Sequence, residues 1–276
     1  MSHAVIQSDL SYLLQKTAWP MTPPSPWSAF HIIFSLLGLT AAVFLAILLA
    51  GHCSPLDSYV PAASRASFIL WICGVLLAVS ELYKQFFIYE IVNQGQYDWW
   101  YFPFQLCSTP MYLCLVFPLI PPGVPRKTAA SYLQSFGLLG GIMALAEPSG
   151  LMHPFWTLTL HGLLWHIFLV FIALFCAALG LAGKTTRDFL CTVPLFFVFC
   201  LVATAINVLT GGKADMFYIS PYYPVTQVVF HQISLILGVI PGIGIYLASI
   251  CVGAFLCSKL SNRLTDHLQQ KQRKKA

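Results

Sequence analysis

A thiol, an amide and two hydroxyls are grouped between two prolines in residues 103–110, at the start of an apolar segment. The thiol belongs to Cys107 and the amide to Gln105. A cysteine becomes a good nucleophile when a nearby base or cation favours its thiolate form. The run is therefore a candidate for nucleophilic catalysis, provided that another segment brings a base to Cys107.

The composition indicates which kind of scaffold would position these residues. Of 276 residues, 58% are hydrophobic and only 8% are charged, whereas soluble globular domains carry about 25% charged residues. So few charges cannot cover a water-facing surface, and we expect an integral membrane protein. Because a helix needs about 20 apolar residues to cross a bilayer, hydropathy predicts an all-α bundle of seven transmembrane helices. The predicted spans are 30–51, 66–89, 102–120, 128–146, 155–181, 189–209 and 232–257.

The remaining segments flank this transmembrane domain, which we place at 30–257. Residues 1–29 are polar or proline-rich and form a predicted extracytoplasmic segment; span one is too long for the core of a cleavable signal peptide. Residues 258–276 form a predicted basic tail. We expect Pro241 to kink the last span.

The basic residues orient the bundle. Most of the fourteen Lys and Arg residues fall in alternate loops and in the tail, while Lys16, Lys84 and Lys213 fall on the other side. The excess of positive charge marks the cytoplasmic side. This distribution predicts an outer N-terminus and a cytoplasmic C-terminus in a cell membrane.

With this orientation, polar residues at membrane depth gather in the outer leaflet, whereas the inner halves of the spans read as nearly pure hydrocarbon. Ionisable groups at such depth are costly and normally face the bundle interior. We therefore predict a cavity open to the outer side. The polar groups that would line it are Glu81, Cys107, Glu147, His161, Thr204, Asn207 and His231.

Each central residue also has an ordinary structural explanation. Glu81 can pair with Lys84 at i+3, a buried Cys is usually an inert small hydrophobe, and a lone His can bond a carbonyl. His166 is a second candidate base, but it points about 140° away from His161 around a helix. We favour His161, whose depth is closer to that of Cys107.

Other cofactor and partner classes lack a signal. The nine cysteines lie mostly in apolar spans and show no C-x-x-C or paired Cys/His zinc spacing. No glycine-rich phosphate loop is present, and no basic soluble module would bind nucleic acid. We predict no metal and no cofactor, with membrane phospholipids as the partners.

Four motifs, taken in order, resemble those of a known family. They are Glu81, the run 103–107, the triplet 160–162, and the segment 206–211 followed by Met216-Phe217 and Pro221. Their order and spacing resemble the YwaF-like integral membrane proteins of bacteria, and more distantly transmembrane protein 164 of animals. The resemblance covers spans two to seven and favours a bacterial plasma membrane as the location.

The resemblance implies a cysteine-dependent acyltransferase acting on membrane phospholipids, with Cys107 as nucleophile and His161 as the histidine. Glu81 and Asn207 match family positions without a settled role. A fainter similarity is to small membrane hydrolases of lipid esters. Gln105 stands where the family has a histidine, so a base at that position is absent here.

Three hypotheses follow. In the first, the protein is a lipid acyltransferase or acyl-ester hydrolase: Cys107 attacks an ester, His161 is general base and then general acid, and Glu81 orients His161. Asn207 or Gln105 would then bond the oxyanion. In the second, the protein transports a small solute or a lipid. In the third, it is a non-catalytic lipid-binding scaffold whose polar groups only join helices.

Overall fold

The computed structural model describes residues 11–53 and 62–273. The start of the predicted N-terminal segment, residues 1–10, and the end of the basic tail, residues 274–276, therefore lie outside the described residues. Within the described part, the regular elements are helical, and the one extended pairing is an isolated bridge between Pro20 and Phe155. The all-α prediction is confirmed.

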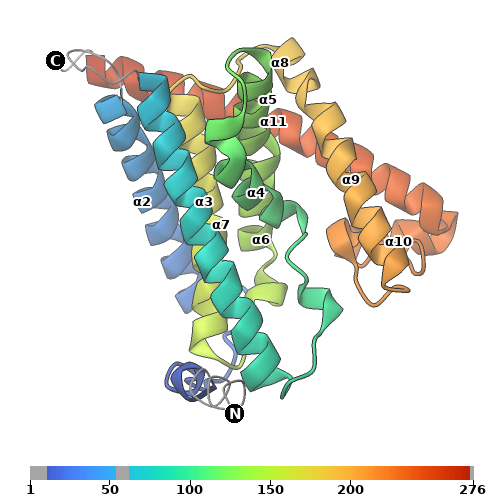
Figure 1. The fold of residues 1–276 in the computed structure, drawn as a ribbon. Helices are drawn as coiled ribbons and strands as arrows, with labels where there is room; N and C mark the ends of the chain where they lie inside the picture. The colour runs from blue at the N-terminus through green and yellow to red at the C-terminus, as the bar shows by residue number, and fades with distance from the viewer. Residues whose placement is uncertain (1–10, 54–61, 274–276) are drawn as a thin grey trace.

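The helices follow one another through the bundle (Figure 1). In order they are α2 (Ala29–Cys53), α3 (Ala62–Phe87), η1 (Ile88–Val92), η2 (Trp99–Tyr101), η3 (Leu106–Ser108), α4 (Thr109–Val116), η4 (Phe117–Leu119), α5 (Val124–Tyr132), η5 (Leu133–Gly137), α6 (Leu138–Ala146), η6 (Pro148–Leu151), α7 (Trp156–Ala178), α8 (Thr186–Leu190), α9 (Thr192–Leu209), η7 (Met216–Tyr218), α10 (Val228–Leu237) and α11 (Val239–Arg273).

Six helical segments of the described chain are long and apolar enough to cross a membrane. They are Ala29–Cys53, Ser64–Val92, Val124–Ala146, Trp156–Ala178, Thr186–Leu209 and Val239–Leu268. Together with the shorter apolar stretch Leu106–Leu119, these segments pass alternately between the two ends of the bundle, and α2 begins at the end opposite to the one where α11 finishes (Figure 1). The protein is thus a multi-pass integral membrane protein, and its predicted orientation stays a prediction.

The third predicted span, 102–120, is shorter than expected. Its helical part is Leu106–Leu119, which rises only about 21 Å at 1.5 Å per residue. Proline explains the shortening: Pro110 lies in the first turn of α4 and Pro118 lies in the 3₁₀ turn η4, and each lacks the N–H that would continue a preceding helix. The segment begins as a non-helical stretch before Leu106 and continues as the short helices η3, α4 and η4.

The last predicted span, 232–257, is also different, because the chain breaks at Gly238 and not at Pro241. Gly238 has a φ of +92°, a conformation that glycine adopts without steric cost. Residues 232–237 therefore belong to the separate helix α10, which packs against α11. A Cβ at Gly242 would lie 2.0 Å from Ser234 Oγ, so the two helices meet at a glycine.

Glycines elsewhere let helices approach closely, as the G-x-x-x-G spacing of Gly137 and Gly141 predicts. A Cβ at Gly141 would lie 2.9 Å from the His166 carbonyl oxygen, and one at Gly137 would lie 3.4 Å from Pro110. α3 also approaches α4 closely at Gly74, where a Cβ would lie 2.6 Å from the Leu115 backbone nitrogen.

The end of the bundle opposite the predicted cavity is less purely apolar than expected. Gln134 Nε2 donates to Ser261 Oγ at 2.8 Å and to Asn262 Oδ1 at 2.7 Å, and all three side chains are buried. α11 continues through this cluster to Arg273. The segment predicted as a basic tail from 258 therefore begins as a packed helix, since its polar side chains find partners inside the bundle.

Candidate functional site

The turn that carries Cys107 is shaped by its neighbours in sequence. Gln105 is extended, the 3₁₀ turn η3 follows, and α4 begins at Thr109. Thr109 Oγ1 donates to the Leu106 carbonyl at 2.8 Å, and the Tyr112 hydroxyl donates to the Pro103 carbonyl at 2.6 Å. Cys107 therefore lies immediately before the N-terminus of α4, as the sequence predicts.

Long-range bonds hold this turn in the bundle. Trp165 Nε1, on α7, donates to the Cys107 carbonyl at 3.1 Å. Gln105 Nε2 donates to the Asp215 carbonyl at 2.9 Å, and Gln105 Oε1 accepts from the Phe217 N–H at 2.8 Å. Gln105 thus joins the Cys107 turn to η7, a structural role that the sequence analysis did not consider.

A cavity of about 150 Å³ opens beside Cys107, at the end of the bundle where α3 finishes and α7 begins. It brings together four of the five predicted site residues, Glu81, Gln105, Cys107 and His161, and the second candidate base His166. Its lining is completed by Lys84, Ile88, Trp100, Tyr101, Phe102, Ser108, Gly150, Leu151, His153, Leu158, Gly162, Trp165 and Tyr218.

The two histidines of α7, His161 and His166, differ in their hydrogen bonds. His166 Nδ1 bonds the Gly162 carbonyl at 2.6 Å; a carbonyl only accepts, so Nδ1 carries the proton. His161 Nε2 is buried and has no hydrogen-bond partner among the described residues. The His161 ring lies 5.4 Å from the ring of Trp165. A buried ring nitrogen without a partner is free to exchange a proton with a bound molecule.

Glu81 pairs with Lys84 and not with a histidine. Lys84 Nζ lies 2.7 Å from Glu81 Oε1, and the Glu81 and Lys84 side chains are 7% and 20% exposed. Gln85 Nε2 also donates to Glu81 Oε1 at 2.7 Å. The i+3 pair that sequence spacing allows is therefore present, but it lines the cavity. Lys84 therefore brings a cation to the cavity lining.

Asn207 lies outside this lining. Its Nδ2 donates to the Met216 carbonyl at 3.0 Å and its Oδ1 accepts from the Met216 N–H at 2.6 Å. Both bonds are buried, so the amide serves the backbone of η7. The next two residues, Phe217 and Tyr218, both have a φ of +59°, which is costly for non-glycine residues, and Tyr218 lines the cavity.

Two ionisable groups in the loops around the cavity have shifted pKa values. Burial lowers the pKa of His153, and the charge of Lys84 lowers it further. Burial raises the pKa of Asp215, against the hydrogen bonds that its carboxylate accepts from Ser220 and Thr226. In the part of the chain that the structure describes, no group of three or more His, Cys, Asp or Glu side chains could hold a metal ion.

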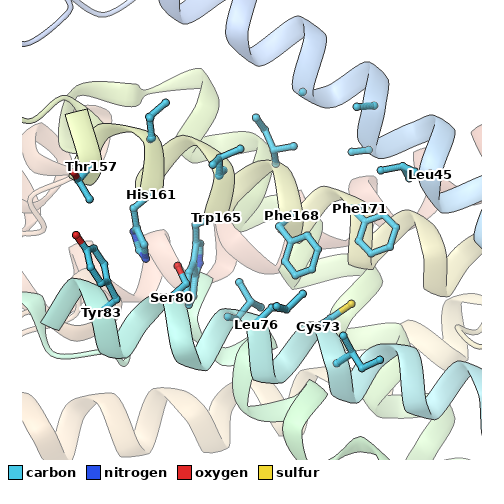
Figure 2. Close-up of a pocket in the computed structure, with 18 of the residues that line it drawn as sticks. Leu45, Cys73, Leu76, Ser80, Tyr83, Thr157, His161, Trp165, Phe168 and Phe171 are labelled. Carbon is cyan, nitrogen blue, oxygen red and sulfur yellow. The ribbon is translucent and has the colours of Figure 1, made fainter. Parts of the chain in front are cut away.

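A second cavity, of about 1030 Å³, lies between α2, α3 and α7. Figure 2 shows its lining side chains in rows along these helices, with His161, Tyr83 and Thr157 at one end. His161 and Trp165 line both cavities and so stand between them. The sequence analysis missed this feature, because apolar residues at helical spacing look the same whether they fill a core or line a cavity.

Comparison with known proteins gives one match. A family model described as the TMEM164 family matches residues 25–260. No curated protein and no solved structure matches the chain. The match agrees with the resemblance to transmembrane protein 164, and the likeness to the YwaF-like proteins stays a prediction.

Proposed function

Because this chain belongs to the TMEM164 family, we propose that it is a membrane-embedded acyltransferase or acyl-ester hydrolase that acts on membrane phospholipids. The observation that carries the proposal is the shared cavity of Cys107, His161 and the Glu81–Lys84 pair. A thiol, a histidine with a free buried nitrogen and a cation are the groups that acyl transfer through a thioester needs.

The first half-reaction uses Cys107 and His161. His161 accepts the thiol proton, and the Cys107 sulfur attacks the carbonyl carbon of an ester. The C–O bond to the lipid alcohol then breaks, His161 returns the proton to the leaving oxygen, and the acyl group stays on Cys107 as a thioester. No oxidant or reductant is involved.

The second half-reaction releases the acyl group. A hydroxyl group of an acceptor lipid, or water, gives its proton to His161 and attacks the thioester. The C–S bond breaks and the Cys107 sulfur recovers the proton. An alcohol acceptor completes acyl transfer, and water completes hydrolysis.

Oxyanion stabilisation falls to groups that line the cavity. Gln105 Nε2 donates one N–H to the Asp215 carbonyl, and its second N–H can donate to an oxyanion. The Lys84 ammonium, which also lines the cavity, is a charged donor. Asn207 lies outside the cavity lining and bonds the backbone of Met216, so we assign it a positioning role, through η7, and not a role at the oxyanion.

The cavity does not favour the transport hypothesis. Among the described residues its lining comes from one end of the bundle, reaching Trp165 and His166 on α7. Beyond them the core contains aromatic stacks, such as Phe136 on Phe196 at 4.6 Å between ring centroids, and the buried polar cluster around Gln134 does not belong to the cavity lining. A polar solute would find no continuous polar lining there.

The decisive experiment compares cysteine variants of the purified protein in phospholipid nanodiscs. Cys107→Ala should abolish the release or transfer of acyl chains, followed by lipid mass spectrometry, and should lose an acyl adduct that neutral hydroxylamine removes from the wild type. Cys114→Ala is the matched control, because Cys114 is a fully buried thiol on the same segment outside the cavity lining.

Histidine variants then identify the base. His161→Ala should abolish adduct formation, whereas His166→Ala should retain it if the protein folds. Unchanged lipid products in Cys107→Ala would overturn the mechanism and leave the transporter and scaffold hypotheses.

A further inference from the structure

The large cavity between α2, α3 and α7 changes in polarity along its length. The hydroxyl groups of Tyr83, Ser80 and Thr157 lie beside His161 at one end, and Cys73, Leu76, Phe168 and Phe171 follow toward the other (Figure 2). No charged side chain belongs to its lining among the described residues. This is the pattern of a site for a molecule with one polar end and a long apolar chain.

The length of the apolar part matches one membrane leaflet. His161 and Phe171 are ten residues apart on α7, which corresponds to roughly 15 Å along the helix axis. The hydrocarbon core of a bilayer is about 30 Å thick, so one leaflet contributes about 15 Å. A single acyl chain of a membrane lipid therefore fits between His161 and the far end of the cavity.

The cavity reaches the surface of the bundle that faces lipid. Leu45 on α2 and Leu76 on α3 line it and are 47% and 56% exposed. A chain can therefore enter sideways from the bilayer without crossing water. At the polar end, Thr17 and Trp19 of the N-terminal segment complete the lining, and Thr157 Oγ1 donates to the Thr17 carbonyl, which ties that segment to α7.

We propose that this cavity, defined as the acyl groove, holds the acyl chain that is transferred through Cys107. The reason is the wall that the two cavities share: His161 and Trp165 line both. A chain lying in the acyl groove ends at His161, and its ester carbonyl then reaches the polar cavity where Cys107 lies. The transfer of the chain through Cys107 rests on the proposed function, whereas the binding of the chain in the acyl groove does not.

Binding is tested without catalysis. The purified Cys107→Ala protein is reconstituted in nanodiscs of phosphatidylethanolamine and phosphatidylglycerol containing a phosphatidylethanolamine with a diazirine in its sn-2 chain. After illumination, mass spectrometry of peptides should find labels concentrated on the groove faces of α2, α3 and α7. Labels spread over all lipid-facing helix surfaces in proportion to exposure would overturn the proposal.

Groove-filling variants give a matched comparison. Leu45→Trp and Leu76→Trp place a larger ring in the acyl groove and should lower groove labelling several-fold. Leu37→Trp and Leu82→Trp are the controls, because these leucines sit on the same two helices, are 67% and 57% exposed and lie outside both linings. Equal labelling in all four variants would refute the assignment.

The same variants separate this proposal from the proposed function. In the active protein, Leu45→Trp and Leu76→Trp should shift the released or transferred acyl chains toward shorter ones, with the controls unchanged. Groove labelling without any Cys107-dependent product would keep the binding site and overturn the cysteine mechanism. Suppose instead that product formation depends on Cys107 but that Leu45→Trp and Leu76→Trp leave the lengths of the acyl chains unchanged. That result would keep the cysteine mechanism and overturn the acyl groove.

Discussion

Replacing Lys84 by Met tests whether the cavity beside Cys107 holds a desolvated ion pair. Lys84 Nζ lies 2.7 Å from Glu81 Oε1, with the two side chains 20% and 7% exposed. Removing one partner of a buried ion pair typically costs about 3–5 kcal/mol, because the other charge is left buried without compensation. Glu81 keeps its bond from Gln85 and Lys84 is partly exposed, so we expect about 3 kcal/mol, at the lower end of that range.

An exposed pair in the same protein supplies the control. Lys184 Nζ lies 2.5 Å from Asp266 Oδ1, with the side chains 53% and 44% exposed. Exposed pairs contribute about 0–1 kcal/mol, so Lys184→Met should cost far less than Lys84→Met. The free energy of unfolding is measured by titrating the purified protein with sodium dodecyl sulfate and following its circular dichroism.

The double variant Glu81→Gln/Lys84→Met tests the same ion pair in a second way. Because it leaves no uncompensated charge, it should recover most of the stability that Lys84→Met loses. If Lys84→Met costs no more than Lys184→Met, or if the double variant is as unstable as the single one, the pair is well hydrated and the reasoning is refuted.

Two further predictions concern the frame around the site. Gly74→Ala would place a Cβ 2.6 Å from the Leu115 backbone nitrogen. The helices α3 and α4 must then separate, which should lower the free energy of unfolding by about 1–3 kcal/mol. Gly51→Ala is the control, because a Cβ there would meet nothing within 4 Å, and it should change the free energy of unfolding by no more than about 0.5 kcal/mol in the same titration. Asn207→Ala leaves the buried Met216 N–H without its acceptor, at about 1–3 kcal/mol, whereas the Met216 carbonyl keeps its bond from the Ile219 N–H; an unchanged unfolding midpoint would contradict the role of Asn207 in holding η7.

The membrane fold follows from composition and hydropathy. With few charges the chain cannot face water, and backbone groups in lipid must bond within their own helix. These two constraints act locally, so the helices that begin near Ala29, Ala62, Val124 and Trp156 lie close to the predicted spans.

Hydropathy predicted the wrong span bounds where a proline or glycine interrupts the helix. Residues 102–120 are apolar on average, yet Pro110 and Pro118 divide them into short helices. Residues 232–257 read as one span, yet Gly238 turns the chain back on itself. Hydropathy averages over a window, so a single residue that changes φ or removes an N–H is lost in it. The buried bonds of Gln134 were missed for a related reason, since their partners on α11 are far away in sequence.

The sequence by itself determined that Cys107 stands before a helix N-terminus and that His161 stands early in a span starting from the same end of the bundle, because helix starts and topology are local properties. Only the tertiary structure decided that Glu81 pairs with Lys84, that Gln105 holds the Cys107 turn to η7, and that His161 lies between a small polar cavity and a large apolar one. Such partnerships depend on the direction of each side chain and on the distance between helices, and neither is encoded by hydropathy along the chain.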